Sequence, residues 1–215
     1  MDPIEGVHIH VTTARSGLQE EFVTDVTGEF KKKLTDEKRG DKVEYLITLS
    51  KDGYLPNSLS ITKHFTRTGV HTIWGELQIQ LIPIEVGDDL GQLIALEDIY
   101  FDFDKANIRP DAAIELDKIV EVMNDAPNLV IELGSHTDCR GDDKYNQILS
   151  EKRAKSSAAY IKARISNPER ISGKGYGESQ PVNDCGCGKS RKESECTEEE
   201  HQLNRRTEFR IVEMD

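Results

Sequence analysis

The sequence from Asn128 to Ile165 reads NLVIELGSHTDCRGDDKYNQILSEKRAKSSAAYIKARI. Its first six residues, Asn128 to Leu133, are mostly apolar and predict a strand. A helix is predicted from near Asn146, because small and apolar side chains then recur at helical spacing along one face, at Ala154, Ala158, Ile161 and Ile165. A polar loop joins the two, so this stretch predicts a strand–loop–helix unit.

The sequence on either side of this unit also alternates between strand and helix. Ile99 to Phe103 predicts a strand, and Pro110 is expected to open a helix. That helix would bury a stripe formed by Ala113, Leu116, Val120 and Met123. Two further strands are predicted, one from Ile171 and one from Glu208 to Val212. The alternation predicts an α/β (α+β) domain, with a mixed sheet and helices packed on it.

Residues 4–83 show a different pattern, in which short runs are separated by turns. Val7 to Val11 and Val43 to Leu49 alternate apolar and polar residues, which is the period of half-buried strands. Turn residues lie at Thr24 to Gly28, and a last strand is predicted from Thr72 to Leu81. The first part of the chain is therefore expected to form a small antiparallel β-sandwich.

The two patterns meet at a polar joint that contains Gly87, Asp88, Asp89 and Gly91. We therefore predict a β-sandwich at 1–86, a linker at 87–98 and the α/β domain at 99–215. A chain of 215 residues is long enough for each domain to bury its own core.

The first domain resembles the carboxypeptidase-regulatory-like, transthyretin-type β-domains. The resemblance rests on the hairpin Thr24-Asp25-Val26-Thr27-Gly28-Glu29-Phe30 and on Tyr45-Leu46-Ile47-Thr48-Leu49-Ser50-Lys51-Asp52-Gly53-Tyr54. Much of this similarity consists of residues that are common in β-hairpins generally. It therefore indicates a fold and assigns no ligand.

Net charge and the distribution of apolar residues bear on two classes of protein, nucleic-acid binders and membrane-spanning proteins. The net charge is −12, and the basic surface typical of nucleic-acid binders is not visible in the sequence. No run reaches the roughly 20 apolar residues of a membrane span. Met1 opens directly into strand-like sequence without a signal peptide, which leads us to expect a fragment of a longer precursor.

All four cysteines, Cys139, Cys185, Cys187 and Cys196, fall in polar, loop-like sequence. An even number in an extracytoplasmic domain favours disulfides, and a zinc site is the rival interpretation. The spacing lacks the Cys-x2-Cys doublets of common zinc modules. Cys185 and Cys187 are too close to pair with each other, so each is expected to bridge to Cys139 or Cys196.

The loop before the predicted helix combines an acid, an amide and an arginine, at Asp138, Asn146 and Arg153. Asn146 and Arg153 are seven residues apart, about two helical turns, and so share one helix face. Taken singly, Asn146 is a common helix cap, Arg153 a solvated helix residue and Asp138 a turn residue. Together with Asp104 at a strand end they predict a site for a zwitterionic ligand.

The chain from Ile99 to its C-terminus resembles the C-terminal OmpA-like peptidoglycan-binding domain. The motifs that carry the resemblance are Phe101-Asp102-Phe103-Asp104-Lys105-Ala106-Asn107-Ile108, Thr137-Asp138-x-Arg140-Gly141, Tyr145-Asn146-x-x-Leu149-Ser150-x-x-Arg153-Ala154, Gly175-Tyr176-Gly177-Glu178 and Asn204-Arg205-Arg206-Thr207-Glu208. Cys139 and the Cys-rich insertion from Asn183 to Glu200 depart from the family pattern. The resemblance implies non-covalent binding of peptidoglycan through the meso-diaminopimelate of its stem peptide.

The resemblance also implies a role for each site residue. Asp138 would accept from the ammonium group of diaminopimelate, and Arg153 would hold its carboxylate as a bidentate pair. Asn146 and Thr137 would be supporting polar contacts. Arg205 or Arg206 would line the rim or pair with Glu208. The other expected contacts are the loop residues Phe103, Asp104, Lys105 and Ala106, and Leu149 as an apolar wall.

Catalysis is not expected. His136 lies two residues from Asp138, but no serine or cysteine nucleophile is placed to complete a triad. His8 and His10 share a strand face without the further ligands of a metal site. We therefore predict no enzyme activity, no catalytic residues, no metal and no cofactor.

These observations predict a two-domain anchor in the periplasm, associated with the outer membrane and the cell wall. It would tether an outer-membrane or secretion-associated assembly to peptidoglycan, as a fragment of an envelope lipoprotein. The alternative is a structural adapter that acts mainly through protein partners of the β-sandwich. Nucleic acid is not an expected partner.

Overall fold

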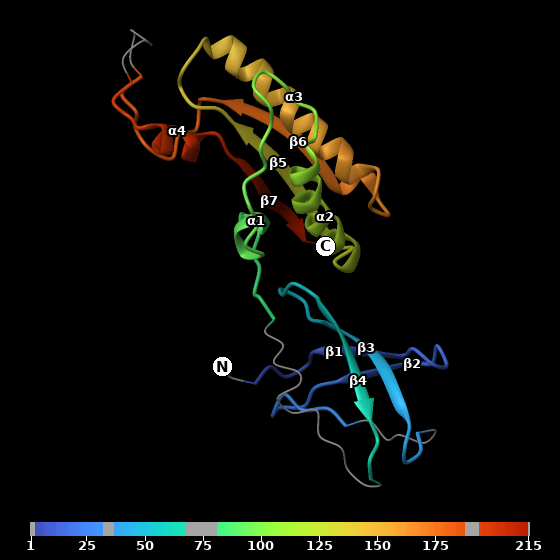
Figure 1. Ribbon diagram of the computed structural model, residues 1–215. Coiled ribbons are helices and arrows are strands. Elements are labelled where there is room, and N and C mark those ends of the chain that lie inside the picture. The colour runs from blue at the N-terminus through green and yellow to red at the C-terminus, as the bar shows by residue number, and fades with distance from the viewer. Residues whose placement is uncertain (1–2, 32–36, 68–80, 188–193, 215) are drawn as a thin grey trace. The chain divides into compact units, whose positions relative to one another are not determined.

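The chain folds into two compact units, residues 1–84 and 85–215, in a computed structural model that describes residues 3–31, 37–67, 81–187 and 194–214 (Figure 1). Within these residues, no helix is long and apolar enough to cross a membrane.

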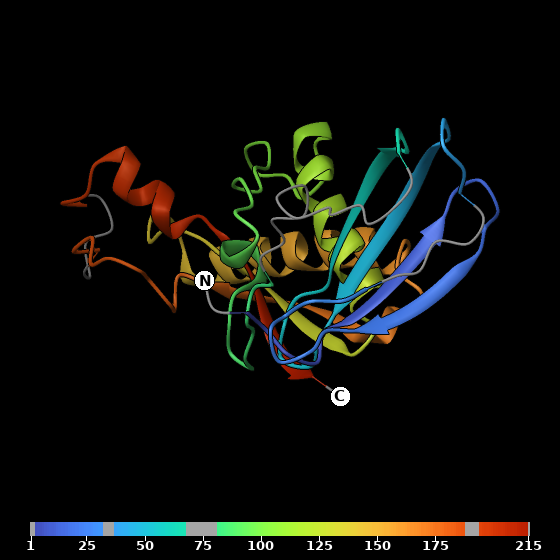
Figure 2. The same ribbon diagram turned by 90° about the horizontal axis from the view of Figure 1, so that it is seen from below.

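The first unit is built on a four-stranded antiparallel sheet of order β2-β1-β3-β4, whose strands lie side by side in Figure 2. The strands are β1 (His8–Thr13), β2 (Gln19–Val23), β3 (Lys42–Ser50) and β4 (Asn57–His64). Alternation along β1 and β3 sends every second side chain to one face, as the sequence predicted. The buried core on that face consists of Val7, Ile9, Val11, Val43, Tyr45, Ile47, Phe65 and Leu81.

Three predictions for this unit have different outcomes. The described residues of the unit hold one sheet, so a sandwich of two sheets is not confirmed. The predicted strand from Thr72 to Leu81 lies outside the described residues, except for Leu81. A carboxylate does accompany the histidine face, because Glu21 on β2 lies 3.1 Å from His8 and 3.9 Å from His10.

The second unit has the predicted mixed architecture. Its strands are β5 (Leu129–His136), β6 (Ile171–Gly177) and β7 (Thr207–Met214), in the order β6-β5-β7. β5 pairs in parallel with β6 and antiparallel with β7. The helices are α1 (Leu90–Leu93), α2 (Pro110–Asp125), α3 (Asp143–Lys162) and α4 (Glu198–Asn204), and a 3-10 turn spans Pro168–Arg170.

Helices α2 and α3 lie on the same face of this sheet (Figure 1). α3 packs most closely on β6, where Gly173 and Gly175 let its backbone approach. The side chain of Ser150 accepts from the Gly177 amide at 2.9 Å, and that of Gln147 donates to the Gly175 carbonyl at 2.7 Å. This close contact fixes the position of every α3 side chain that enters the site.

The predicted linker at 87–98 packs as part of the second unit. The Asp89 side chain caps α1 by accepting from the Gly91 amide, and it also accepts from the Phe209 amide of β7 at 2.8 Å. The backbone of Asp88 accepts from Ile211, and Gly87 donates to Ile211. Hydrogen bonds to the edge of β7, which the sequence does not reveal, bring this polar segment onto the sheet.

The predicted strand from Ile99 to Phe103 is not formed, and this segment is a loop. Asp104 has a left-handed backbone (φ 54°), which ends an extended run. The carbonyls of Asp102 and Lys105 accept from the Arg153 guanidinium rather than from a neighbouring strand. Of the apolar residues in this segment, Phe101 lies against the Arg153 guanidinium, whereas the Phe103 side chain is 94% exposed.

Candidate functional site

The loop between β5 and α3 carries Asp138. α3 begins at Asp143, three residues before the predicted start, because the Asp142 side chain caps it by accepting from the amides of Lys144 and Tyr145. Asn146 therefore lies within the first turn of the helix rather than at its cap.

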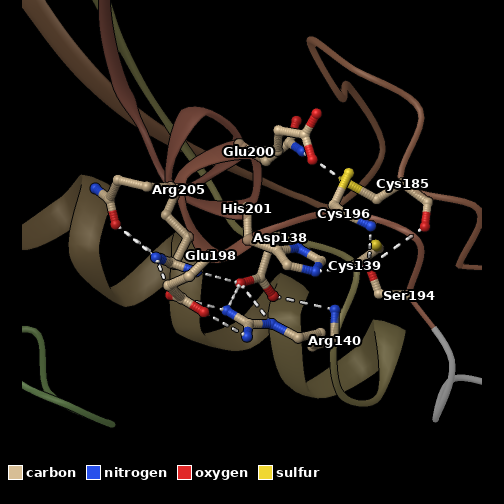
Figure 3. A network of polar contacts seen from close by, with 12 residues as sticks. Asp138, Cys139, Arg140, Cys185, Ser194, Cys196, Glu198, Glu200, His201 and Arg205 are labelled. Carbon is tan, nitrogen blue, oxygen red and sulfur yellow. Dashed lines mark hydrogen bonds and ion pairs between the residues drawn. A yellow bond between two sulfur atoms is a disulfide. The ribbon is translucent and has the colours of Figure 1, made fainter.

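Two arginines hold the carboxylate of Asp138, which is 6% exposed (Figure 3). Arg140 donates through its backbone amide to Oδ1 at 3.0 Å, and through Nε and Nη2 to Oδ2 at 3.1 and 2.6 Å. Arg205 donates through Nη1 to Oδ2 at 2.6 Å. Burial raises the pKa of Asp138, but the hydrogen bonds from both arginines outweigh it and hold the pKa below its usual value. The group is therefore an anion at neutral pH.

Glu198 on α4 completes this cluster. It accepts from Arg140 Nη1 at 2.8 Å and from Arg205 Nη2 at 2.6 Å, so two acids and two arginines alternate (Figure 3). Glu198 was not among the residues predicted for the site, and it falls in the predicted Cys-rich insertion. A signal was present, since Thr197 and Glu200 form a capping box that opens α4.

Arg153, on α3, is held by the loop that precedes α2. Its Nε donates to the Lys105 carbonyl at 3.0 Å and its Nη2 to the Asp102 carbonyl at 3.4 Å, and the group lies 5.0 Å from the Phe101 ring centre. Burial lowers the pKa of Arg153, and the nearby charge of Arg205 acts in the same direction. Among the described residues these bonds use two of the five guanidinium N–H donors.

Asn146 is buried and holds the loop in shape. Its side-chain nitrogen donates to the carbonyls of Asp138 and Arg140, both at 3.2 Å, and to Glu178 at 2.6 Å. The ligand contact that the sequence predicts for Asn146 stays a prediction. The structure shows a bridge from α3 to the Asp138 loop, which positions the carboxylate.

The other predicted site residues are spread around this centre. Asp104 accepts from the Tyr145 hydroxyl at 2.6 Å, and the Phe103 side chain is 94% exposed. Thr137 is buried, and its Oγ1 has no hydrogen-bond partner among the described residues. Ala106 and Leu149 are half-buried.

Arg205 and Arg206 divide the two roles that the sequence allowed. Arg206 pairs with Glu208 at 2.7 Å, whereas Arg205 pairs with Asp138 and Glu198. Arg205 therefore belongs to the site, and Arg206 stabilises the start of β7.

One disulfide ties the Cys-rich insertion to the Asp138 loop, and a second lies within the insertion. They join Cys139 to Cys187 and Cys185 to Cys196, so the disulfide prediction is confirmed and each pair is one that the sequence allowed. Cys139 follows Asp138 directly. The first disulfide therefore links the Asp138 loop to the segment before α4.

Comparison with known proteins bears on the second unit. Residues 100–195 match the OmpA family. We call this segment the OmpA-like region. α4, Arg205 and β7 lie just beyond it.

Two curated relatives are similar to part of the chain. Outer membrane porin F of Pseudomonas fluorescens is 35% identical over 124 residues, which are 57% of this chain and 35% of that protein. Photosystem I P700 chlorophyll a apoprotein A2 of Gloeobacter violaceus is 41% identical over 90 residues, 42% of this chain and 10% of that protein. The chain thus spans about a third of one relative and a tenth of the other.

Among solved structures, the peptidoglycan-associated lipoprotein from Burkholderia pseudomallei is similar over 54% of this chain and 91% of that one. The TM-score is 0.44 and the sequence identity is 23%.

A buried histidine in the OmpA-like region predicts that stability depends on pH. The His136 ring stacks on Tyr176, with centroids 5.1 Å apart, and its nitrogens have no hydrogen-bond partner among the described residues. Burial, aided by the charge of Arg206, lowers the pKa of His136 from 6.5 to about 4. The unfolded chain therefore takes up this proton at higher pH than the folded chain, so stability is full above pH 6.5 and falls with pH down to about 4.

We expect the second unit to lose roughly 2 kcal/mol of unfolding free energy between about pH 7 and about pH 4.5. His136→Gln, which cannot take up the proton, should remove most of this loss in urea unfolding followed by the helical circular dichroism signal. His64→Gln, at an exposed position of β4, should leave the pH dependence unchanged. An unaltered dependence in His136→Gln would assign it to other groups.

Proposed function

We propose that the OmpA-like region binds peptidoglycan non-covalently, through the diaminopimelate residue of its stem peptide. The chain would thereby anchor an envelope assembly to the cell wall on the periplasmic side of the outer membrane. The match to the OmpA family and the outer-membrane relative support this proposal. The observation that carries it is Arg205, which binds Asp138 at 2.6 Å and whose charge also acts on Arg153 of α3.

The ligand end that fits this arrangement is a zwitterion. The free stereocentre of diaminopimelate carries one ammonium and one carboxylate. Asp138 remains ionised and offers a negative charge to the ammonium, while Arg153 offers N–H donors to the carboxylate. Arg205 interacts with both residues. It pairs with Asp138, and its charge helps to lower the pKa of Arg153.

The ion pairs of Arg140 and Arg205 with Asp138 determine how the ligand would bind. Arg140 is partly exposed and also holds Glu198, which is itself exposed. When the ammonium group of the ligand binds Asp138, Arg140 can break its ion pair with Asp138 and keep its ion pair with Glu198. Arg205 is more buried than Arg140, so it would keep its ion pair with Asp138. The proposed role is binding, and it requires no bond in the wall to be broken.

Retention on purified peptidoglycan sacculi tests the proposal. We expect Asp138→Ala and Arg153→Ala each to weaken retention by about tenfold or more, since a charge-assisted hydrogen bond contributes roughly 1.5–3 kcal/mol. Asp117→Ala and Arg164→Ala are matched controls, because this partly exposed acid–arginine pair lies 3.8 Å apart elsewhere in the same unit. Both controls should be retained like the unmodified chain.

Sacculi of different chemistry sharpen the test. Lysine-type peptidoglycan lacks the carboxylate at the stereocentre, so it should bind the unmodified chain more weakly than the diaminopimelate type. The Arg153→Ala variant should no longer distinguish the two types. Equal retention of both types by the unmodified chain, or full retention of the Asp138 and Arg153 variants, would contradict the proposed site.

A further inference from the structure

Four cysteines and a histidine gather beside the Asp138 loop, and the proposed function does not use them. Ligand atoms of Cys139, Cys185 and His201 all lie within 4.8 Å of one another (Figure 3). The sulfurs of Cys187 and Cys196 are bonded to the first two. Four sulfurs and one imidazole nitrogen therefore share a small volume between the loop, the insertion and α4.

The histidine is the observation that points to a ligand. His201 is 2% exposed, and its Nδ1 has no hydrogen-bond partner within the described part of the chain. Its other nitrogen, Nε2, lies 2.6 Å from the Ser194 hydroxyl. A buried polar atom without a partner is costly, whereas a histidine with one nitrogen held by the protein and the other open is the usual arrangement of a metal ligand.

We propose that this cluster is a zinc site when its cysteines are reduced. Cys139, Cys185 and His201 would supply three ligands, and the thiolate of Cys187 or Cys196 the fourth. Thiolates and imidazole are the preferred ligands of Zn²⁺ in structural sites. At Zn–S distances of about 2.3 Å, sulfurs on a tetrahedral ion lie about 3.8 Å apart. The 4.8 Å grouping is compatible with that spacing after side-chain rotation.

The oxidised chain is converted to the zinc-binding state by reduction of its disulfides. A trialkylphosphine reduces each disulfide, taking the oxygen of one water molecule to become a phosphine oxide and leaving two thiols. Zinc then binds the thiolates, and the thiol protons pass to the buffer. The amide of Asn204, 3.6 Å from the Cys185 sulfur, is placed to stabilise a thiolate there.

The two states would hold the same loop. In the oxidised chain the Cys139–Cys187 bond ties the residue after Asp138 to the insertion. In the reduced chain a zinc ion bound by Cys139 and His201 would tie that residue to α4, which also carries Glu198. Zinc would thus replace the disulfides as the clamp on the Asp138 loop.

The test uses the full chain, reduced with the phosphine under argon and freed of reductant. We expect one Zn²⁺ per chain by competition with a chromophoric chelator, and the visible bands of tetrahedral Co²⁺ with a thiolate charge-transfer band when cobalt is added instead. The oxidised chain should bind neither ion. Thiolate-dependent binding without tetrahedral bands, or no binding by the reduced chain, would overturn the proposal.

Variants assign the ligands. His201→Ala and Cys139→Ser should each lower zinc affinity by at least about tenfold, because even the loss of an outer partner of a metal ligand costs about 10–100-fold. His64→Ala, at an exposed histidine of the first unit, is the matched control and should bind like the unmodified chain. Circular dichroism checks that each variant is folded, and Cys139 is only half-buried, so its serine variant is the less disruptive of the two. Unchanged affinity in both variants would overturn the assignment.

Discussion

Arg170→Ala is expected to lower the unfolding free energy of the second unit by about 3–5 kcal/mol. Arg170 is buried and donates to three carbonyls, those of Met123 at 2.7 Å, Ala126 at 3.0 Å and Leu129 at 3.1 Å. The first two lie at the C-terminal end of α2, where carbonyls lack partners within the helix. The third opens β5, so one side chain joins the helix to the central strand.

Removal of the guanidinium would leave these buried carbonyls without donors, and each such group costs about 1–3 kcal/mol. Burial lowers the pKa of Arg170, which shows that the charge is held at some cost and that the hydrogen bonds must offset it. Urea unfolding, followed by the helical circular dichroism signal, measures the loss.

Two further variants separate hydrogen bonding from packing and charge. Arg170→Met keeps most of the volume but supplies no donor, so it should also destabilise the unit. Arg210→Ala removes an exposed arginine of β7 and should change stability by no more than about 0.5 kcal/mol. If Arg170→Met were as stable as the unmodified chain, the three hydrogen bonds would not be the source of stability.

Local sequence patterns predicted much of the second unit. The strand–loop–helix unit from Asn128, the helix from Pro110 and the strands near Ile171 and Glu208 all form. These elements have strong periodicity, clear start signals or both. Local pattern failed at Ile99 to Phe103, where the segment is a loop whose backbone carbonyl at Asp102 accepts from Arg153 instead of pairing with a strand.

The site was predictable in part. Spacing and resemblance singled out Asp138 and Arg153, which lie on one strand–loop–helix unit. The ion pairs around Asp138 were harder to predict, because Arg205, which binds Asp138, and Glu198, which binds Arg140 and Arg205, lie some sixty residues away and only the fold brings them near. The bonds of Asn146 to two loop carbonyls could not be predicted, because such bonds leave no mark in sequence. His201 was not singled out, because only the fold brings it near Cys139 and Cys185.

Gly175→Ala is the second large effect that we expect. A Cβ built at Gly175 would lie 2.1 Å from the backbone nitrogen of Glu151, 2.5 Å from its Cα and 2.6 Å from the carbonyl carbon of Ser150. All three are helix backbone atoms, which cannot rotate away as a side chain can. α3 would have to move off β6, so we expect a loss of about 3 kcal/mol or more in urea unfolding.

The same displacement would reach the site without touching a site residue. α3 carries Asn146, which bridges to the Asp138 loop, and Arg153, whose position depends on the same helix. Retention on sacculi should therefore fall in Gly175→Ala even at temperatures where the variant is folded. Gly134→Ala on β5 is the matched control, because its Cβ would meet only the side chains of Tyr176 and His136, at 3.2 and 3.3 Å. It should cost less than half as much, since those rings can shift by a few tenths of an ångström. Equal losses in the two variants would mean that tight packing of the whole sheet, rather than the α3–β6 contact, sets the stability of this unit.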